Sequence, residues 1–217
     1  ATGVITTIAG SGPYGFFGDG GPALDARFAL LQGIATDLAG NIFLADSDND
    51  RVRRIEVAGA PDPSDPSTWT IDTVLGSGKR WAEGDGGFVT AAVFDQPGCM
   101  TWDAAGALWL CDNDRIRRVV LSDPADLRTW DIETVGGIGA MATGGDGGPL
   151  AKAGFYAPSD LVFDSSGVAF LADSGIARVR RINTENLEDP ATWVIDRVAG
   201  TSWGCVDNSG RLSKNAT

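Results

Sequence analysis

Residues 33–55 read GIATDLAGNIFLADSDNDRVRRI, and two later stretches of the chain repeat this pattern. They are CMTWDAAGALWLCDNDRIRRV at residues 99–119 and DLVFDSSGVAFLADSGIARVRRI at residues 160–182. Three aspartates hold the same position in the pattern: Asp37, Asp103 and Asp164. They lie 66 and 61 residues apart, which indicates a structural unit that is repeated along the chain.

Two further markers recur with each unit. One is a tryptophan in segments such as STWTIDTVLG, at Trp69, Trp130 and Trp193. The other is a GDGG loop at residues 18–21, 84–87 and 145–148. Because the three markers keep the same order and nearly the same spacing, we infer tandem repeats.

Each unit is predicted to contain four short strands. In the third unit, residues 161–163 are apolar, and Gly167 can adopt the positive φ of a hairpin turn before a return strand at residues 168–172. Residues 178–182 and 193–198 supply two more strands. Four short antiparallel strands per unit are typical of a propeller blade, whereas no stretch shows the period of a long helix. The expected fold is therefore an all-β β-propeller.

The combination of GDGGPA, the G-I-A-x-D-x-x-G-N hairpin and the A-D…R-V-R-R-I ending resembles the NHL repeat, and the resemblance covers essentially the whole chain. It implies three blades of four antiparallel strands, at about residues 33–75, 99–135 and 160–198. It also implies that residues 4–9 are an outer strand of a preceding blade and that residues 200–217 begin a fourth unit. The second unit departs from the pattern at Cys99, Trp102 and Cys111, and the third at Gly175 and Ala177.

About three blades make an incomplete arc, since propellers of this family commonly have six. A blade buries both faces against its neighbours, so an open arc would expose two apolar faces. Either further blades outside this chain or a second copy of it would close the ring. We favour further blades, because the chain ends within a loop that precedes a hairpin.

Composition narrows the chemistry. The chain has 217 residues, a net charge of −12 and no histidine. An acidic surface disfavours nucleic-acid binding, and the absence of histidine excludes histidine-based triads and metal sites. No apolar stretch is long enough to span a membrane. We therefore expect no catalytic residue, metal site or cofactor, and neither nucleic acid nor a membrane as a partner.

Several motifs have a structural and a functional interpretation. Residues 46–50, DSDND, resemble half of a calcium-binding EF-hand loop but lack its later glycine and glutamate, which favours capping of a turn. The GDGG loops carry an aspartate that would repel phosphate, so they are interpreted as turns. The arginine triplets beginning at Arg51, Arg115 and Arg178 are expected to pair with the repeated aspartates, the alternative being an anion-binding face. The three repeated tryptophans are expected to be packing anchors.

The loops before each GDGG differ between units, and the four large aromatic residues in them are candidates for binding a partner: Tyr14, Phe16, Trp81 and Trp203. Burial between blades is the alternative.

Cys99 and Cys111 fall on the two strands of one hairpin. If Asp103 pairs with Ala107 around the turn, the two cysteines lie directly opposite each other, and we expect a cross-strand disulfide rather than two buried thiols. Cys205 has no evident partner. Asn215 begins a glycosylation sequon. Together these features favour a secreted or cell-surface location.

The leading functional hypothesis is a non-catalytic extracellular binding or assembly module, which engages a protein partner or ligand through its loops. This step rests on analogy with related propellers. One alternative is a structural subunit of an extracellular filament or coat, in which copies of the chain associate as homo-oligomers. Another is a metal-dependent hydrolase or lyase-like enzyme whose catalytic residues lie in blades outside this chain.

Overall fold

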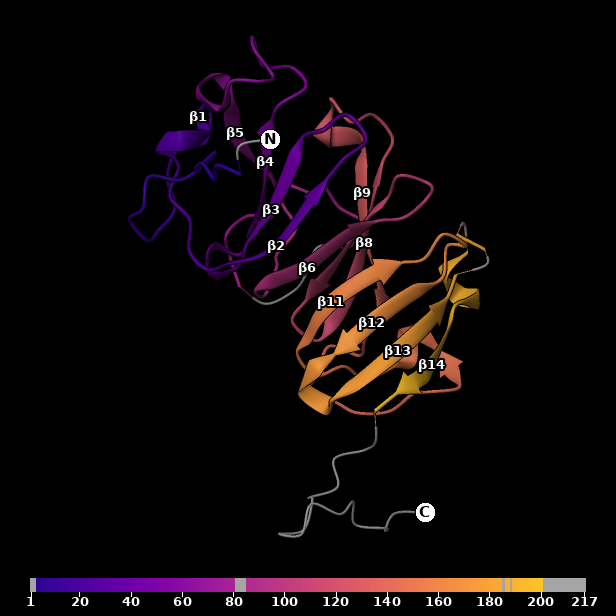
Figure 1. The fold of residues 1–217 in the computed structure, drawn as a ribbon. Helices are drawn as coiled ribbons and strands as arrows, with labels where there is room; N and C mark the ends of the chain where they lie inside the picture. The colour runs from indigo at the N-terminus through magenta and orange to yellow at the C-terminus, as the bar shows by residue number, and fades with distance from the viewer. Residues whose placement is uncertain (1–2, 81–84, 185, 188, 201–217) are drawn as a thin grey trace, which may run out of the picture.

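The computed structural model describes residues 3–80, 85–184, 186–187 and 189–200. These residues form three antiparallel sheets that follow one another along the chain and stack side by side as blades of an open arc (Figure 1). They contain no α-helix, and no helix among them has the length and apolar character needed to cross a membrane. The architecture is therefore an all-β propeller arc of three blades.

Each blade has four main strands. Blade one consists of β2 (Leu31–Thr36), β3 (Ile42–Asp46), β4 (Arg51–Glu56) and β5 (Thr70–Leu75). Blade two consists of β6 (Pro97–Trp102), β7 (Leu108–Asp112), β8 (Arg115–Leu121) and β9 (Trp130–Gly136). Blade three consists of β11 (Pro158–Phe163), β12 (Ala169–Asp173), β13 (Arg178–Asn183) and β14 (Val194–Ala199).

The strands of a blade pair in chain order, from the inner to the outer strand. The GDGG loops add a short fifth strand in two blades: β1 (Gly21–Pro22) pairs with β5, and β10 (Gly148–Pro149) pairs with β14. In blade two, a single bridge joins Phe88 to Asp131 at the same place. Each GDGG loop therefore returns to the outer edge of its own blade.

Short 3-10 turns punctuate the connections between strands. They are η1 (Ala23–Asp25), η2 (Ser47–Asn49), η3 (Pro66–Thr68), η4 (Leu127–Thr129), η5 (Leu150–Lys152), η6 (Ser174–Ile176) and η7 (Pro190–Thr192). The turns η3, η4 and η7 each begin after an aspartate whose carboxylate accepts a backbone N–H of the turn: Asp65, Asp126 and Asp189. This N-capping satisfies a donor that the first turn would otherwise leave unpaired.

The first hairpin of each blade is closed by the repeated aspartate. The Asp37 carboxylate accepts the N–H of Asn41 at 2.8 Å, and Asp103 and Asp164 accept the equivalent backbone N–H groups at 2.9 and 3.0 Å. The glycine that follows in the turn has a positive φ, for example +94° at Gly40. A D-x-x-G sequence therefore fixes the same tight turn in all three blades.

The hydrophobic core lies between blades. Phe43 and Val52 of blade one pack with Leu108 and Trp130 of blade two in one cluster, and Trp109 of blade two belongs to a second cluster with residues of blade three. Trp130 and Trp193 are each 1% exposed. This burial confirms that two of the three repeated tryptophans are packing anchors.

Residues 4–9 do not form the outer strand that the repeat pattern predicts. In blades one to three the equivalent segment pairs with the strand before it, and no described residue offers residues 4–9 such a partner. Ile8 and Ala9 nevertheless pack against the core cluster of Ile42 and Ile55. The segment therefore covers part of blade one without joining a sheet.

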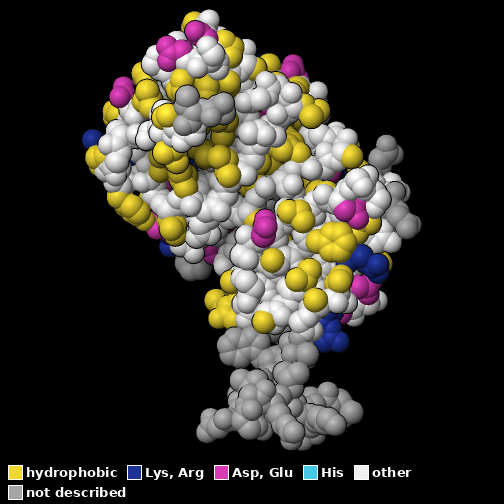
Figure 2. Space-filling view, viewed as in Figure 1, with side chains coloured by type: hydrophobic (Ala, Val, Ile, Leu, Met, Phe, Trp, Pro, Cys, Tyr) yellow, Lys and Arg dark blue, Asp and Glu magenta, His cyan; other side chains and the backbone are white. Residues whose placement is uncertain are grey.

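The opposite end of the arc exposes one face of blade three. Val162, Val179 and Val198 are 51%, 40% and 54% exposed. In blade one, Val52 holds the position of Val179, and it is fully buried against blade two. In the view of Figure 2, hydrophobic side chains lie scattered over the region of β11–β14, with charged side chains at its edge. Blade three thus presents the kind of surface that covers a neighbouring blade elsewhere in the arc.

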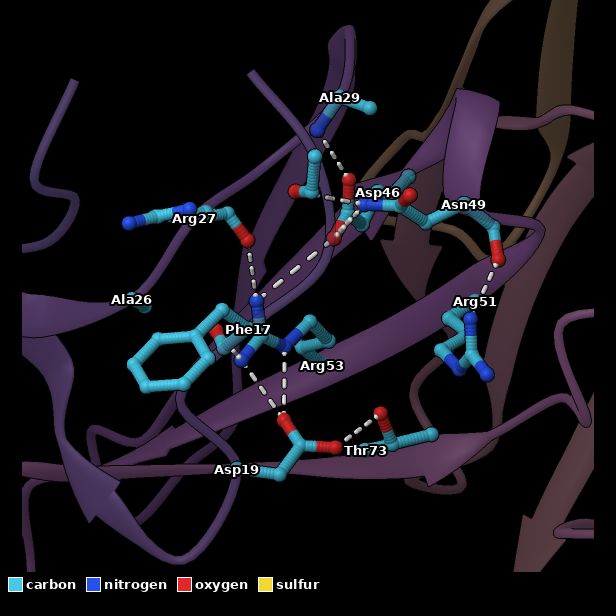
Figure 3. A network of polar contacts seen from close by, with 12 residues as sticks. Phe17, Asp19, Ala26, Arg27, Ala29, Asp46, Asn49, Arg51, Arg53 and Thr73 are labelled. Carbon is cyan, nitrogen blue, oxygen red and sulfur yellow. Dashed lines mark hydrogen bonds and ion pairs between the residues drawn. The ribbon is translucent and has the colours of Figure 1, made fainter. Parts of the chain in front are cut away.

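A buried arginine lies at the same place in each blade. Arg53, the middle arginine of its triplet, has a fully buried side chain that lies 3.7 Å from the carboxylate of Asp46 and 2.7 Å from that of Asp19 in the GDGG loop (Figure 3). It also donates to the carbonyl oxygens of Arg27 and Phe17. Burying a guanidinium requires that its donors be satisfied, and here two carboxylates and two carbonyls do so.

The other two blades repeat the network. Arg117 pairs with Asp85 at 2.7 Å and Asp112 at 3.3 Å, and Arg180 pairs with Asp146 and Asp173 at 2.9 and 3.3 Å. These contacts confirm that the middle arginines pair with the repeated aspartates. They also confirm the interpretation of the GDGG loops as structural turns.

We expect Arg53→Met to lower the free energy of unfolding by about 3–5 kcal/mol, because it leaves the buried Asp46 carboxylate without its counter-charge. Chemical denaturation followed by circular dichroism measures the change. The matched control is Arg128→Met, since Arg128 pairs with Asp126 but is 82% exposed, and its loss should have little effect. Equal losses in the two variants would contradict the importance given to the buried network.

A candidate binding groove between blades one and two

A groove of about 760 Å³ opens where blade one meets blade two. It is bordered by the β2–β3 turn, the β6–β7 turn and the loop that follows β8. This is the opposite end of the strands from the DSDND turn, because the turn at residues 47–50 follows β3 whereas the turn at residues 37–41 precedes it. The volume is within the range of sites that bind small molecules or a few side chains.

The walls of the groove are mainly apolar. Leu38, Ala39, Ala104, Ala105 and Leu121 line it together with the indole of Trp102. Leu38 is fully exposed at the rim. An exposed leucine beside further apolar side chains in a concave site is a feature that ligand-binding grooves share.

Among the residues that border the groove, Trp102 has a polar side-chain atom without a hydrogen-bond partner. Its ring packs edge-on against Phe43 of blade one, with ring centroids 5.1 Å apart. Its Nε1 atom is shielded from solvent and has no hydrogen-bond partner. A buried indole N–H usually has an acceptor, so the fold leaves this donor of Trp102 unsatisfied.

The charged groups of the groove are already engaged by the chain. The Asp37 carboxylate accepts from Asn41, and Arg54 lies 3.3 Å from the Glu56 carboxylate and donates to the carbonyl oxygen of Pro124. The buried Asp103 accepts from backbone N–H groups and from the Trp109 indole. These groups fix the shape of the groove rather than provide a free base or nucleophile.

The aromatic packing differs between the two junctions of the arc. Between blades two and three, Trp109 stacks on Trp193 with centroids 4.8 Å apart and meets Phe163 edge-on. Blade one has the smaller Phe43 at the position of Trp109. The two rings are equivalent because Phe43 pairs with Arg54 and Trp109 pairs with Arg118, the last arginine of each triplet. Phe43 is fully buried and does not itself border the groove, whereas Trp102, which packs on it, does.

Two of the four aromatic candidates from the sequence lie at the other end of blade one. The hydroxyl of Tyr14 donates a hydrogen bond to Asp48, which raises the pKa of Tyr14 and lowers that of Asp48. The Phe16 ring lies under the guanidinium of Arg51, 3.9 Å from its centroid. They are 70% and 42% exposed, so their role in binding a partner stays a prediction. They do not border the groove.

The remaining aromatic candidates, Trp81 and Trp203, lie outside the described residues, as does the glycosylation candidate Asn215. The groove was not predicted. Its only signal in the sequence is that Trp102 departs from the repeat pattern.

Cys99 and Cys111 form the predicted disulfide. They join β6 to β7, with Cα atoms 5.1 Å apart. Met100 pairs with Leu110 in the adjacent register position, which places the cysteines opposite each other as the turn geometry predicted. The bond ties together the hairpin that carries one wall of the groove.

The DSDND turn uses its carboxylates within the chain. Asp46 accepts the N–H of Ala29 and lies near Arg53, Asp48 binds Tyr14 and Gln96, and Asp50 binds Arg80. Among the described residues, no group of three or more cysteine, aspartate or glutamate side chains is arranged to hold a metal ion. These contacts give the motif a structural role, but they link the turn to other segments, and Asp46 makes no capping hydrogen bond to an N–H of the turn itself.

Comparison with known proteins supports the fold. No protein-family model matches the chain, and no curated protein matches it. It is similar to a solved structural genomics protein of unknown function from Bacteroides thetaiotaomicron, with 19% identity and a TM-score of 0.55 over 75% of this chain and 34% of that one.

Two further solved structures resemble it less closely. Virginiamycin B lyase from Staphylococcus aureus matches with 12% identity and a TM-score of 0.43, over 78% of this chain and 42% of that one. An auxiliary nutrient binding protein from B. thetaiotaomicron matches with 19% identity and a TM-score of 0.44, over 73% and 49%. The similar structures are propeller-type proteins, and the chain spans between a third and a half of their lengths. At these identities the likeness concerns the fold alone.

We expect the double variant Cys99→Ala/Cys111→Ala to lower the free energy of unfolding by up to about 3 kcal/mol, since the bond closes a loop of 12 residues. Alanine should fit, because Ala45 and Ala172 occupy the position of Cys111 in the other blades. Denaturation with and without a reductant provides the measurement. The reductant should destabilise the wild-type protein and leave the variant unchanged; equal behaviour of the two would argue against the bond.

Burial raises the pKa of Asp112 to about 6, although the N–H of Asp95 and the guanidinium of Arg117 act against the shift. The folded state therefore binds this proton more tightly than the unfolded state, whose pKa is about 4. The contribution of Asp112 to the free energy of unfolding should fall as pH rises from about 4 to about 6 and then stay constant.

The ¹³C carboxyl shift of Asp112, followed by NMR against pH, measures this pKa directly. Asp126 is the internal control, because its hydrogen bonds with Arg128 lower its pKa to about 2. A midpoint for Asp112 at or below its ordinary value would contradict the dominant effect of burial.

Proposed function

We propose that the chain is a non-catalytic binding module of the NHL-repeat propeller type, and that the groove between blades one and two is its ligand site. The observation that carries this proposal is the indole of Trp102, which borders an apolar groove of about 760 Å³ with an N–H that has no partner. The ligand class is an apolar molecule or peptide segment with a carbonyl oxygen that can accept this hydrogen bond.

The state of the polar groups supports binding rather than catalysis. Catalysis of acyl or proton transfer needs a nucleophile or base that can reach the substrate. The carboxylates at the groove are instead held by backbone N–H groups, by Asn41 or by Arg54, and the chain contains no histidine.

An extracellular or cell-surface location is part of the proposal. It is supported by the disulfide between Cys99 and Cys111, since such bonds persist in oxidising compartments, and by the acidic net charge of −12. The sequon at Asn215 agrees with this location.

Assembly is the second candidate role, and the exposed face of blade three favours it. Val162, Val179 and Val198 hold positions that cover the next blade elsewhere in the arc. A protein partner, a further blade or a second copy of the chain that supplies an equivalent face would remove these valines from water.

Selection of displayed random peptides on the purified chain tests the binding function. We expect selected peptides rich in apolar residues, whose affinity falls at least about tenfold in Ala104→Glu, because a carboxylate would be placed in an apolar wall. Trp102→Phe keeps the ring and removes the N–H, so it should weaken binding by about 0.5–1.5 kcal/mol. Fluorescence anisotropy of the labelled peptides measures each affinity.

The matched control is Ser165→Glu, because Ser165 holds the position of Ala104 in the hairpin turn of blade three. It should leave affinity unchanged. Peptides that ignore Ala104→Glu but are lost in Val179→Glu would reject the groove and identify the exposed face of blade three as the binding surface.

A further inference from the structure

A second, smaller cavity lies at the other end of blade two, by the turn between β7 and β8. Its volume is about 60 Å³, enough for roughly two water molecules or one compact polar head group. It is bordered by Asp95, Asp112, Asn113, Asp114, Arg115 and Gly139. It shares no lining residue with the groove.

One carboxylate of this cavity is incompletely satisfied. Asp114 is only 6% exposed, and its Oδ1 atom is shielded from solvent without a hydrogen-bond partner. A buried carboxylate oxygen without a donor is costly, since native structures pair nearly all such atoms. Burial, and after it the neighbouring Asp95 carboxylate, raises the pKa of Asp114, whereas the Arg115 guanidinium acts against the shift. A donor placed in the cavity would satisfy the unpaired oxygen.

Blade one has a guanidinium paired with the aspartate at the matching place in the sequence, although that aspartate ends a 3-10 turn in the left-handed conformation, which Asn113 and not Asp114 has in blade two. In blade one, the aspartate that immediately precedes the triplet is Asp50, and its carboxylate accepts from the guanidinium Nε of Arg80 at 3.1 Å. Arg80 comes from the loop that leads into the next blade, two residues after Gly78. At the next junction the equivalent residue, two after Gly139, is Met141, which carries no charge.

The lining of the cavity carries more negative than positive charge, with three aspartates, Asp95, Asp112 and Asp114, against one arginine, Arg115. Asp112 is paired with Arg117 at 3.3 Å, and Asp95 holds the side-chain amide of Asn113 at 2.9 Å. Arg115 borders the cavity and has contacts of its own. Two carboxylates, those of Asp95 and Asp114, thus face one arginine, and a monovalent cation would balance them.

We propose that this cavity binds the guanidinium group of a ligand, which takes the place at Asp114 that Arg80 takes at Asp50. A guanidinium presents several N–H donors in one plane, so it can satisfy the unpaired Oδ1 of Asp114 while it contacts Asp95. A metal ion fits less well, because the described carboxylates form no group arranged to hold one. The proposal concerns a different site from the groove and does not depend on it.

Two guanidinium compounds serve as probes: agmatine, as a free small molecule, and the tripeptide acetyl-Gly-Arg-Gly-amide. Each is titrated into the ¹⁵N-labelled chain, and the amide resonances of Asp114 and Gly139 are followed by NMR. We expect saturable shifts of both resonances. Tighter binding of the tripeptide would assign the site to an arginine of a protein partner, and tighter binding of agmatine would assign it to a free guanidinium compound.

Two variants remove the site in different ways. Asp114→Asn removes the charge, and Met141→Arg supplies the guanidinium from the chain itself, so each should weaken binding about tenfold or more. Asp131→Asn is the matched control, since it removes one exposed negative charge from the same blade outside the cavity. It should leave the affinity unchanged. Because Met141→Arg removes no native contact of Asp114, it tests the site even if Asp114→Asn fails to fold.

Several results would overturn the proposal. One is the absence of saturable shifts in the wild-type chain, and another is equal binding by Met141→Arg. The lysine tripeptide acetyl-Gly-Lys-Gly-amide should bind more weakly, so equal affinity would reject a guanidinium-specific site. Sodium or calcium chloride alone should not reproduce the shifts, and if either did, an inorganic cation would be the occupant.

Discussion

The buried arginine of each repeat is the constraint on which the rest of the blade depends. Arg53, Arg117 and Arg180 are almost completely removed from water, and a guanidinium in that setting must find acceptors for its donors. One acceptor comes from the end of the same hairpin and another from the GDGG loop, tens of residues earlier in the chain. The pairing therefore fixes where the loop must cross the blade. It also explains why the loop keeps an aspartate between glycines in all three units.

Because of this constraint, the two ends of each blade differ in how far their residues can vary. The end with the β3–β4 turn, or its equivalents, carries the aspartate that pairs with the buried arginine, so most of its charged groups have fixed partners. The end with the D-x-x-G hairpin turns needs only a tight turn, and its side chains can vary in size. Blade one has Phe43 where blade two has Trp109, and Trp102 in the wall of the groove stands where blade three has Phe163.

Repetition made the fold and the ion pairs predictable, because three copies of one pattern separate required residues from variable ones. The disulfide was predictable for a related reason: a tight turn sets the register, and the register places Cys99 opposite Cys111. The groove was not, since it depends on the volumes of side chains in two different blades. Residues 4–9 have the composition of a strand but lack a described partner, and strand propensity alone cannot form a ladder.

The small cavity lies where the second junction has no counterpart of Arg80. Between blades one and two, the loop that leads into blade two supplies Arg80, which pairs with the Asp50 carboxylate of the β3–β4 turn. At the second junction the turn is two residues shorter and the loop supplies Met141, yet the carboxylate is retained as Asp114. Fold stability alone would favour an uncharged residue there, because an unpaired buried oxygen is unfavourable. A cation bound from outside the chain would pair with the Asp114 carboxylate and so offset this cost.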